Sequence, residues 1–425
     1  MDTKKVVRNY AGTVSGEARY CPDSGNWMCW SDSWWKRDVG EVMSVTLALK
    51  HTDGDIPAST VREILWILEH TPEMCVPLSK WDSHPFLMAC EGVTVDLSTS
   101  EGLRPRPEWF LTKCCPVTPA ASSTPVWDSF FSWFNNHDIP RMEAMMRLLG
   151  YFLTGSIREQ KIYFLHGPGR NGKTVLLELV KHLMGDHAVS ASPLLLVKDA
   201  QGNRHLTELM TLCGARLGIM SELAPGSKLD VARMKYLTGG DTICARGMRQ
   251  DEVNFTNTCK LIAAVNDLPE IEIGAGVAEK RRVVIIPCPN IVPEEDIDPD
   301  LLDKLKAEAP GILAKIIAGA KRYLEGGIQW TQDVTDATSE MWADGNHLEE
   351  FITEEAVLGL ELRVGKNEFY QRYAGHCFNA GMEKPSSQLV SRSMKKLGYK
   401  DMMSNGKRYW RNISLKSLDS GEGGW

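Results

Sequence analysis

Along residues 161–290, apolar runs typical of strands alternate with segments that have helical spacing of apolar residues, as in an α/β protein. The apolar run Ile162 to Leu165 predicts a buried strand. From Val175 to Met184 the apolar residues recur at helical spacing, and Gly185 marks the place where that helix stops. Further apolar runs and helical patterns continue to residue 290. We therefore predict an α/β core whose parallel sheet is packed against helices.

The patterns on either side of this core divide the chain into three predicted domains. Residues 1–125 are rich in Trp, Cys and Pro, with a helical pattern at 60–70 and a hairpin pattern at 86–97. Residues 126–338 carry two helical patterns, the α/β core and a further helical pair. The polar residues 331–345 predict a link, and residues 339–418 predict a separate basic domain.

Four tryptophans gather near the start of the chain, at positions 27, 30, 34 and 35. Such a cluster is either an aromatic platform for nucleic-acid bases or a compact core built on large side chains. The general tendency of Trp to be buried favours the core.

A glycine-rich loop follows the strand that ends at Leu165. Residues 167–174 read Gly167, Pro168, Gly169, Arg170, Asn171, Gly172, Lys173 and Thr174, which fits the phosphate-loop pattern Gly-x-x-x-x-Gly-Lys-Thr. Glycines let consecutive N–H groups face one anion, and the helix that follows adds its positive dipole end. Lys173 is predicted to reach the β- and γ-phosphates of ATP, and Thr174 to hold Mg²⁺. A glycine-rich surface turn is the alternative, and the flanking strand and helix argue against it.

Polar residues follow later apolar runs of the core and suit the same site. Glu222 ends one run and is a candidate to act on Mg²⁺ or on water. Asn266 ends another, as a sensor of the γ-phosphate or as an ordinary turn residue. Arg281 and Arg282 precede a third run, as surface charge or as arginines supplied to the nucleotide of a neighbouring subunit.

The residues between Glu222 and Asn266 predict a short helix and then a hairpin inserted between two core strands. Arg246 and Arg249 lie on or near the tip of this hairpin. An exposed basic hairpin can grip a phosphate backbone, although an ordinary solvated hairpin has the same pattern.

Composition sets the wider limits. The net charge is −7, the chain has 11 cysteines without a Cys-x-x-Cys pair, and no apolar run is long enough to span a membrane. The start of the chain lacks the apolar segment of a signal peptide. We expect a cytoplasmic protein with reduced thiols, no zinc site and no membrane partner.

The order of these features resembles superfamily 3 helicases of the phage, plasmid and poxvirus primase–helicase type. The segments that are similar to family signatures are the loop at 167–174, Lys235 to Asp241, Ala245 and Arg246, Asn266 to Pro269, and Arg281 and Arg282. Residues 91–97, 148–151 and 308–313 are similar to regions that flank the helicase core. The resemblance extends over roughly residues 80–415 and is weak over the Trp-rich start.

This resemblance implies an AAA+-like P-loop ATPase core, preceded by an α+β helicase-associated domain and followed by a winged-helix-like domain. It implies a ring, commonly a hexamer, that hydrolyses ATP with Mg²⁺ and moves along single-stranded DNA. Such a motor would unwind DNA during the replication of a phage, virus or mobile element. It would act in the cytoplasm of a bacterial host cell or at a viral replication site. A separate primase or polymerase is a candidate partner.

The resemblance also implies a role for each motif residue. Lys173 and Thr174 would bind the triphosphate and Mg²⁺, Glu222 would polarise water, and Asn266 would be the polar sensor. Arg282, rather than Arg281, would reach into the adjacent subunit, and Arg246 and Arg249 would lie on a hairpin that lines the pore.

The chain departs from the family in two places. Many relatives have two acids where this chain has Ser221 and Glu222. Glu222 is therefore the base, the Mg²⁺ partner or both, and Asp241 is a candidate for the second role. In addition, about 120 residues in front of the core are few for a primase domain, so we expect no priming activity.

A basic region near the carboxyl end favours attachment to DNA. Residues 363–411 hold 11 Lys or Arg and 3 acids, a net charge of 11 − 3 = +8. Helical spacing at 364–380 and 386–397, followed by a strand at 407–413, resembles a winged helix, and Arg392, Lys395 and Lys396 are the candidate contacts. The region either binds DNA or docks a partner protein. It also supports a rival function, an ATP-switched DNA-binding initiator or loader that does not separate strands.

Overall fold

The structure is a computed structural model that describes residues 15–50, 56–198, 207–220, 222–224, 226–246, 252–269, 280–342, 345–380, 384–404 and 406–416. The chain forms two compact units, Met1–Thr331 and Gln332–Trp425. Each unit has its own hydrophobic core.

Two small sheets form the amino-terminal part of the first unit. The first is an antiparallel meander of β1 (Ala18–Cys21), β2 (Asn26–Trp30) and β3 (Trp35–Arg37), accompanied by the helices α2 (Val42–Lys50) and α3 (Ala58–Glu69). The second has the order β6-β5-β4-β7, with β4 (Leu87–Cys90), β5 (Val93–Asp96), β6 (Glu101–Leu103) and β7 (Cys114–Cys115). Trp27 and Trp35 are buried, so the prediction that this cluster builds a core is confirmed for these two side chains.

A five-stranded sheet forms the centre of the unit. Its strands are β8 (Ile162–His166), β9 (Ala188–Ala191), β10 (Leu217–Met220), β13 (Lys260–Val265) and β14 (Val283–Pro287), in the order β14-β8-β13-β10-β9. Every neighbouring pair is parallel, which confirms the predicted α/β core. Because all five strands point the same way, their carboxyl ends meet at one edge, and β13 lies between β8 and β10.

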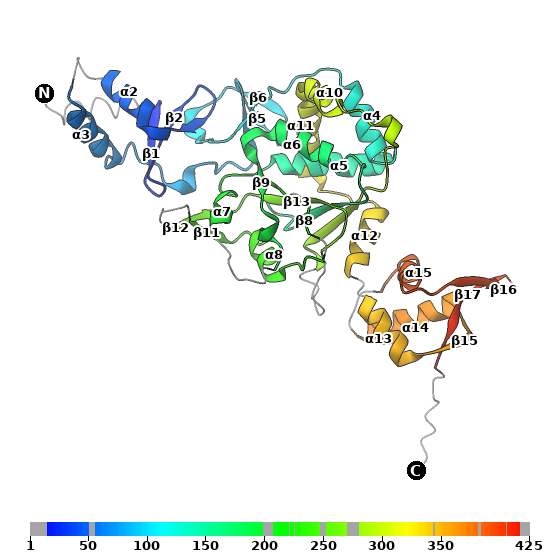
Figure 1. Ribbon diagram of the computed structural model, residues 1–425. Coiled ribbons are helices and arrows are strands. Elements are labelled where there is room, and N and C mark those ends of the chain that lie inside the picture. The colour runs from blue at the N-terminus through cyan, green and yellow to red at the C-terminus, as the bar shows by residue number, and fades with distance from the viewer. Residues whose placement is uncertain are drawn as a thin grey trace, which may run out of the picture. The chain divides into compact units, whose positions relative to one another are not determined.

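Helices lie around and beside this sheet (Figure 1). They are α4 (Pro125–Phe134), α5 (Ile139–Leu153), α6 (Lys173–Met184), α7 (Thr207–Met210), α8 (Val231–Thr238), α10 (Leu301–Ala307) and α11 (Ala309–Gly326). Figure 1 shows α5, α6 and α11 grouped on one side of the sheet and α8 on the other. A Cβ at Gly150 of α5 would overlap the backbone of Ala320, so glycine lets α5 and α11 pack at close range.

Two buried cations tie the sheet to the amino-terminal part. The Arg216 guanidinium, just before β10, donates to the carbonyl oxygens of Leu153 and Leu87, each at 2.5 Å. Lys260, the first residue of β13, donates its Nζ to the carbonyl oxygen of Thr154. Burial lowers the pKa of Arg216 to about 10 and lowers that of Lys260 as well. Both cations therefore satisfy carbonyls at the carboxyl end of α5, where positive charge is favoured.

The second unit contains helices and a three-stranded antiparallel sheet. Its elements are α12 (Gln332–Trp342), α13 (Gly345–Glu355), β15 (Ala356–Gly365), α14 (Lys366–Asn379), α15 (Ser387–Lys396), β16 (Asp401–Ser404) and β17 (Lys407–Leu415). The sheet order is β15-β17-β16, and β16 and β17 form a hairpin. Phe351, Phe369 and Trp410 are fully buried between the helices and the sheet.

The structure corrects the expectation of a polar link at residues 331–345. Residues 332–342 form α12, in which Val334 is the described side chain that is buried. Its apolar residues Val334, Ala337 and Met341 form only a narrow stripe in a mostly polar segment, and the sequence pattern therefore indicates a link.

Candidate nucleotide site

The glycine-rich loop connects β8 to α6 and is fixed against the end of β14. The helix begins at Lys173, and its N-cap Gly172 has φ of 76°, a left-handed conformation that favours glycine. A Cβ at Gly167 would overlap the carbonyl oxygen of Cys288, which follows β14. The Asn171 side chain donates to the same carbonyl at 3.0 Å. These contacts hold the loop against the backbone that follows β14, and the loop turns there into the start of α6.

This fit predicts that Gly167→Ala damages the site. The new methyl group must displace the backbone after β14, which costs about 1–3 kcal/mol of folding free energy. We expect a lower thermal midpoint in calorimetry and weaker ATP binding. Gly169→Ala is the control, because a Cβ there meets nothing within 4 Å. Equal stability and equal ATP affinity of the two variants would contradict the described loop geometry.

Lys173 lies at the centre of the loop. Its side chain is 5% exposed, and its Nζ donates to the carbonyl oxygens of Gly167 at 2.6 Å and Pro168 at 3.0 Å. It also donates to Oδ1 of Asn266 at 3.1 Å. Burial lowers the pKa of Lys173. The ammonium is thus held inside the loop by three neutral oxygens, a setting in which an entering anion is attracted strongly.

Asn266 connects Lys173 to the acid of the next strand. Its side chain follows β13, and its Nδ2 donates to Oε1 of Glu222, beyond the end of β10, at 2.5 Å. β8, β13 and β10 are neighbours, so ammonium, amide and carboxylate form a continuous chain along the carboxyl edge of the sheet. The structure brings together Lys173, Asn266 and Glu222, as the sequence predicts. Their catalytic roles stay predictions.

The remaining loop residues form an exposed rim. Pro168, Gly169, Arg170 and Thr174 are exposed, whereas Asn171 is buried. Arg170 pairs with Glu294 at 3.3 Å.

Oxygen donors suited to Mg²⁺ are present at the expected positions. The Thr174 hydroxyl lies in the first turn of α6, and the Glu222 carboxylate is oriented by Asn266. Mg²⁺ is commonly held by one or two protein oxygens together with substrate phosphates and water, so this donor set fits the ion. Within the described ranges, no group of three or more His, Cys, Asp or Glu is placed to hold a metal ion.

Arg282 lies at the opposite edge of the sheet from this site. The parallel register places Val283 opposite Ile162, the first residue of β8, whereas the loop follows the last residue of β8. The Arg282 guanidinium donates to Oγ1 of Thr238 at 2.6 Å, at the end of α8, and Arg281 is exposed. Neither arginine belongs to the nucleotide site of its own chain. Asp241 lies three residues beyond Thr238 in the chain.

The predicted hairpin is present as β11 (Thr242–Arg246) and β12 (Glu252–Thr256). Arg246 is exposed and is paired in register with Glu252. Arg249 lies outside the described residues. The base of the hairpin is bonded to α8, because Asn257 donates to the carbonyl oxygen of Leu237 at 2.6 Å.

The candidate DNA contacts of the second unit lie on α15. Arg392 and Lys395 are exposed, and Arg392 pairs with Glu340 of α12 at 3.5 Å. The side chain of Lys396 lies outside the described residues. The sequence did not single out Lys366 or Arg408, which line a pocket beside α15. Alternation along the predicted strand at 407–413 was the available signal, since it places Arg408 and Trp410 on one face.

The fold and the loop define an α/β protein with a phosphate-loop-like turn at the carboxyl edge of a parallel sheet. Residues 5–134 match the family model described as "D5 N terminal like", and residues 165–282 match a family of unknown function (DUF5906). The second match begins in β8 and ends at Arg282, so it spans the loop, Glu222 and Asn266.

Relatives with curated names come from large DNA viruses and a virophage. A protein named "Putative helicase" from Acanthamoeba polyphaga mimivirus is 26% identical over 265 residues, which is 56% of this chain and 28% of the relative. Another with that name, from the Sputnik virophage, is 25% identical over 255 residues, 51% of this chain and 33% of the relative. The matched parts thus span about a third of these relatives' own length.

A solved structure, the apo structure of the NrS-1 C terminal region (305–718), aligns with 97% of this chain and 100% of its own. Sequence identity is 13% and the TM-score is 0.49.

The family match and these relatives confirm the resemblance to helicases of the phage and viral primase–helicase type. In the part of the chain that the structure describes, no helix has the length and apolar character needed to cross a membrane.

Proposed function

We propose that this protein is an ATP-driven DNA helicase of superfamily 3 that works as a ring in the replication of a virus, phage or mobile element. The observation that carries the proposal is the contact chain Lys173, Asn266 and Glu222 at the mouth of the glycine loop. It combines a phosphate-binding cation, a polar sensor and an acid, which are the parts that nucleoside triphosphate hydrolysis requires.

In this proposal the γ-phosphate of ATP replaces the neutral oxygens around the Lys173 ammonium. Asn266 then loses its contact to Lys173 and takes up the phosphate or the attacking water. Glu222, which Asn266 holds at 2.5 Å, is positioned to polarise that water. Mg²⁺ held by Thr174 and Glu222 would supply charge stabilisation at the phosphates.

The position of Arg282 supports a ring rather than an isolated subunit. It lies at the edge of the sheet away from its own loop, so it can approach a triphosphate only in another subunit. A repeated contact of this head-to-tail kind closes into a ring when the rotation permits.

The hairpin supplies the proposed grip on DNA. Arg282 contacts Thr238 at the end of α8, and α8 leads within a few residues into β11. If the nucleotide of the neighbouring subunit displaced Arg282, the end of α8 and the base of the hairpin would therefore move with it. The names of the viral relatives support an action on nucleic acid.

A forked DNA substrate distinguishes this function from an ATP-switched initiator or loader. We expect the full chain with ATP and Mg²⁺ to release one strand continuously, and no release with ADP. ATP-dependent assembly and DNA binding without strand release would favour the initiator and contradict the helicase. Negative-stain images of the same preparation with ATP and single-stranded DNA show whether a ring forms and how many subunits it has.

A further inference from the structure

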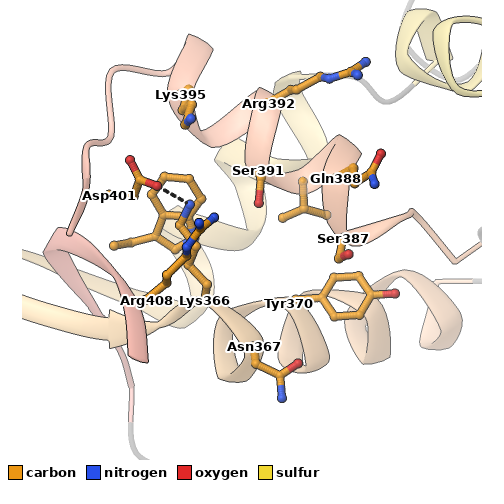
Figure 2. Close-up of a pocket in the computed structure, with 12 residues that line it drawn as sticks. Lys366, Asn367, Tyr370, Ser387, Gln388, Ser391, Arg392, Lys395, Asp401 and Arg408 are labelled. Carbon is orange, nitrogen blue, oxygen red and sulfur yellow. Dashed lines mark hydrogen bonds and ion pairs between the residues drawn. The ribbon is translucent and has the colours of Figure 1, made fainter. Parts of the chain in front are cut away.

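A basic pocket lies in the second unit between the helices α14 and α15 and the hairpin β16–β17. Its volume is about 480 Å³, which is within the range of ligand sites and larger than one phosphate group requires. Lys366 and Tyr370 come from α14, Ser391 and Lys395 from α15, and Arg408 from β17. Figure 2 shows these side chains around the pocket, with the ion pair between Lys366 and Asp401 drawn as a dashed line.

The charge of the pocket is strongly positive. Lys366, Arg392, Lys395 and Arg408 line it, and Asp401 is the one acid among its described lining residues, so the balance is 4 − 1 = +3. Hydroxyl and amide groups complete the polar lining, from Asn367, Ser387, Gln388 and Ser391. A concave site with several cations and neutral donors suits a phosphodiester.

The acid in the pocket, Asp401, forms an ion pair with one of the cations, Lys366. Lys366 donates to Oδ2 of Asp401 at 2.8 Å, and its Nζ lies 3.9 Å from the centroid of the buried Trp410 ring. The Lys366 hydrogen bond lowers the pKa of Asp401, which is therefore ionised at neutral pH. Asp401 holds Lys366 in the pocket wall and also repels any anion that enters.

We propose that this pocket binds a phosphodiester unit of a nucleic-acid strand, with Lys366, Lys395 and Arg408 as the phosphate contacts and Asp401 as a competing anion. The inference rests on the proposed action on DNA and gives that action a defined attachment site. It moves the contact surface from the outer face of α15 into the space between α14, α15 and β17. Arg392, which is already paired with Glu340, has a smaller part.

Three variants of the full chain test this site by fluorescence anisotropy with labelled oligonucleotides. Arg408→Ala removes a pocket cation and should weaken binding roughly threefold to tenfold and reduce the slope of log affinity against log salt by about one. Arg411→Ala is the matched control, because Arg411 lies on the same strand with the opposite parity and is exposed. It should change the affinity less than about twofold.

Asp401→Asn gives the sharper result. It removes the competing anion and frees Lys366, so the affinity should rise roughly threefold. Misfolding does not produce tighter binding. The ion pair is partly exposed, so its loss should leave the thermal midpoint of the variant close to that of the unmodified chain. Equal affinities of the Asp401→Asn, Arg408→Ala and Arg411→Ala variants would overturn the proposal.

The probes identify the source of the phosphodiester. Single-stranded and duplex oligonucleotides of the same sequence are compared, with a free nucleoside monophosphate as a competitor. A response to the variants with either oligonucleotide supports the site and shows which form it prefers. Variants that alter only monophosphate binding would exclude a nucleic-acid strand. Strand release from forked DNA is measured separately, so a failure of the helicase proposal appears there and not in the anisotropy.

Discussion

Lys173→Ala should reduce ATP turnover by about 100-fold or more, because it removes a cation that stabilises charge on the transferred phosphate. Strand separation should be lost with it. Lys173 donates to three oxygens that are neutral, so its removal leaves no uncompensated charge in the site. The fold should therefore survive, and phosphate release and a forked-DNA assay measure the loss.

Lys181→Ala is the matched control for this variant. Lys181 lies on the same helix α6 and donates to Oγ of Ser190 at 2.8 Å, away from the loop. We expect near-normal turnover from it and similar circular dichroism spectra from both variants. Normal unwinding by the Lys173→Ala variant would remove the basis of the proposed nucleotide site.

Mixing two inactive variants should restore activity if each ATP site is shared between subunits. Arg282→Ala loses the arginine supplied to the neighbour and should lower turnover by about 100-fold. In a mixed ring, an Arg282→Ala subunit still has its loop, and a Lys173→Ala subunit still has its arginine. Equal random mixing makes about a quarter of the interfaces complete, so turnover should recover to about a quarter of the normal value.

Two further measurements make this result decisive. Arg281→Ala is the neighbouring control, because its exposed side chain has the same charge and directly precedes Arg282. Mixtures of Lys173→Ala and Arg282→Ala subunits are prepared at several ratios. A complete absence of recovery at every ratio, with rings still visible, would contradict a site shared across subunits.

The core of the fold could be predicted from the sequence because its signals are local. Buried strands such as β8 and β14 are continuous apolar runs, and α6 has a wide apolar stripe between a glycine loop and Gly185. Glu222 and Asn266 could be assigned for the same reason, since each stands within two residues of the end of such a run. Their contact with Lys173 depends on the order of the strands, which the sequence pattern does not specify.

In the second unit the predicted helices at 364–380 and 386–397 and the predicted strand at 407–413 are present as α14, α15 and β17. β15 was not predicted. Its leucines at 358, 360 and 362 are spaced as for a buried strand face, yet they are 60%, 85% and 37% exposed. A register shift between Leu358 and Arg363 interrupts the alternation. The pocket was missed because Lys366, Lys395 and Arg408 are far apart in the chain and meet only after α14, α15 and β17 have packed.

The buried guanidinium of Arg216 joins the amino-terminal part of the first unit to its central sheet. It is bonded to carbonyls on β4 and at the end of α5, and the adjacent Lys260 binds the next carbonyl of the same helix. Bending the chain at this junction would break these hydrogen bonds and leave buried polar groups without partners. The sheet that contains β4 and the central sheet are thus fixed to each other at this junction. We therefore expect any movement that the proposed ATP cycle requires to take place elsewhere in the chain.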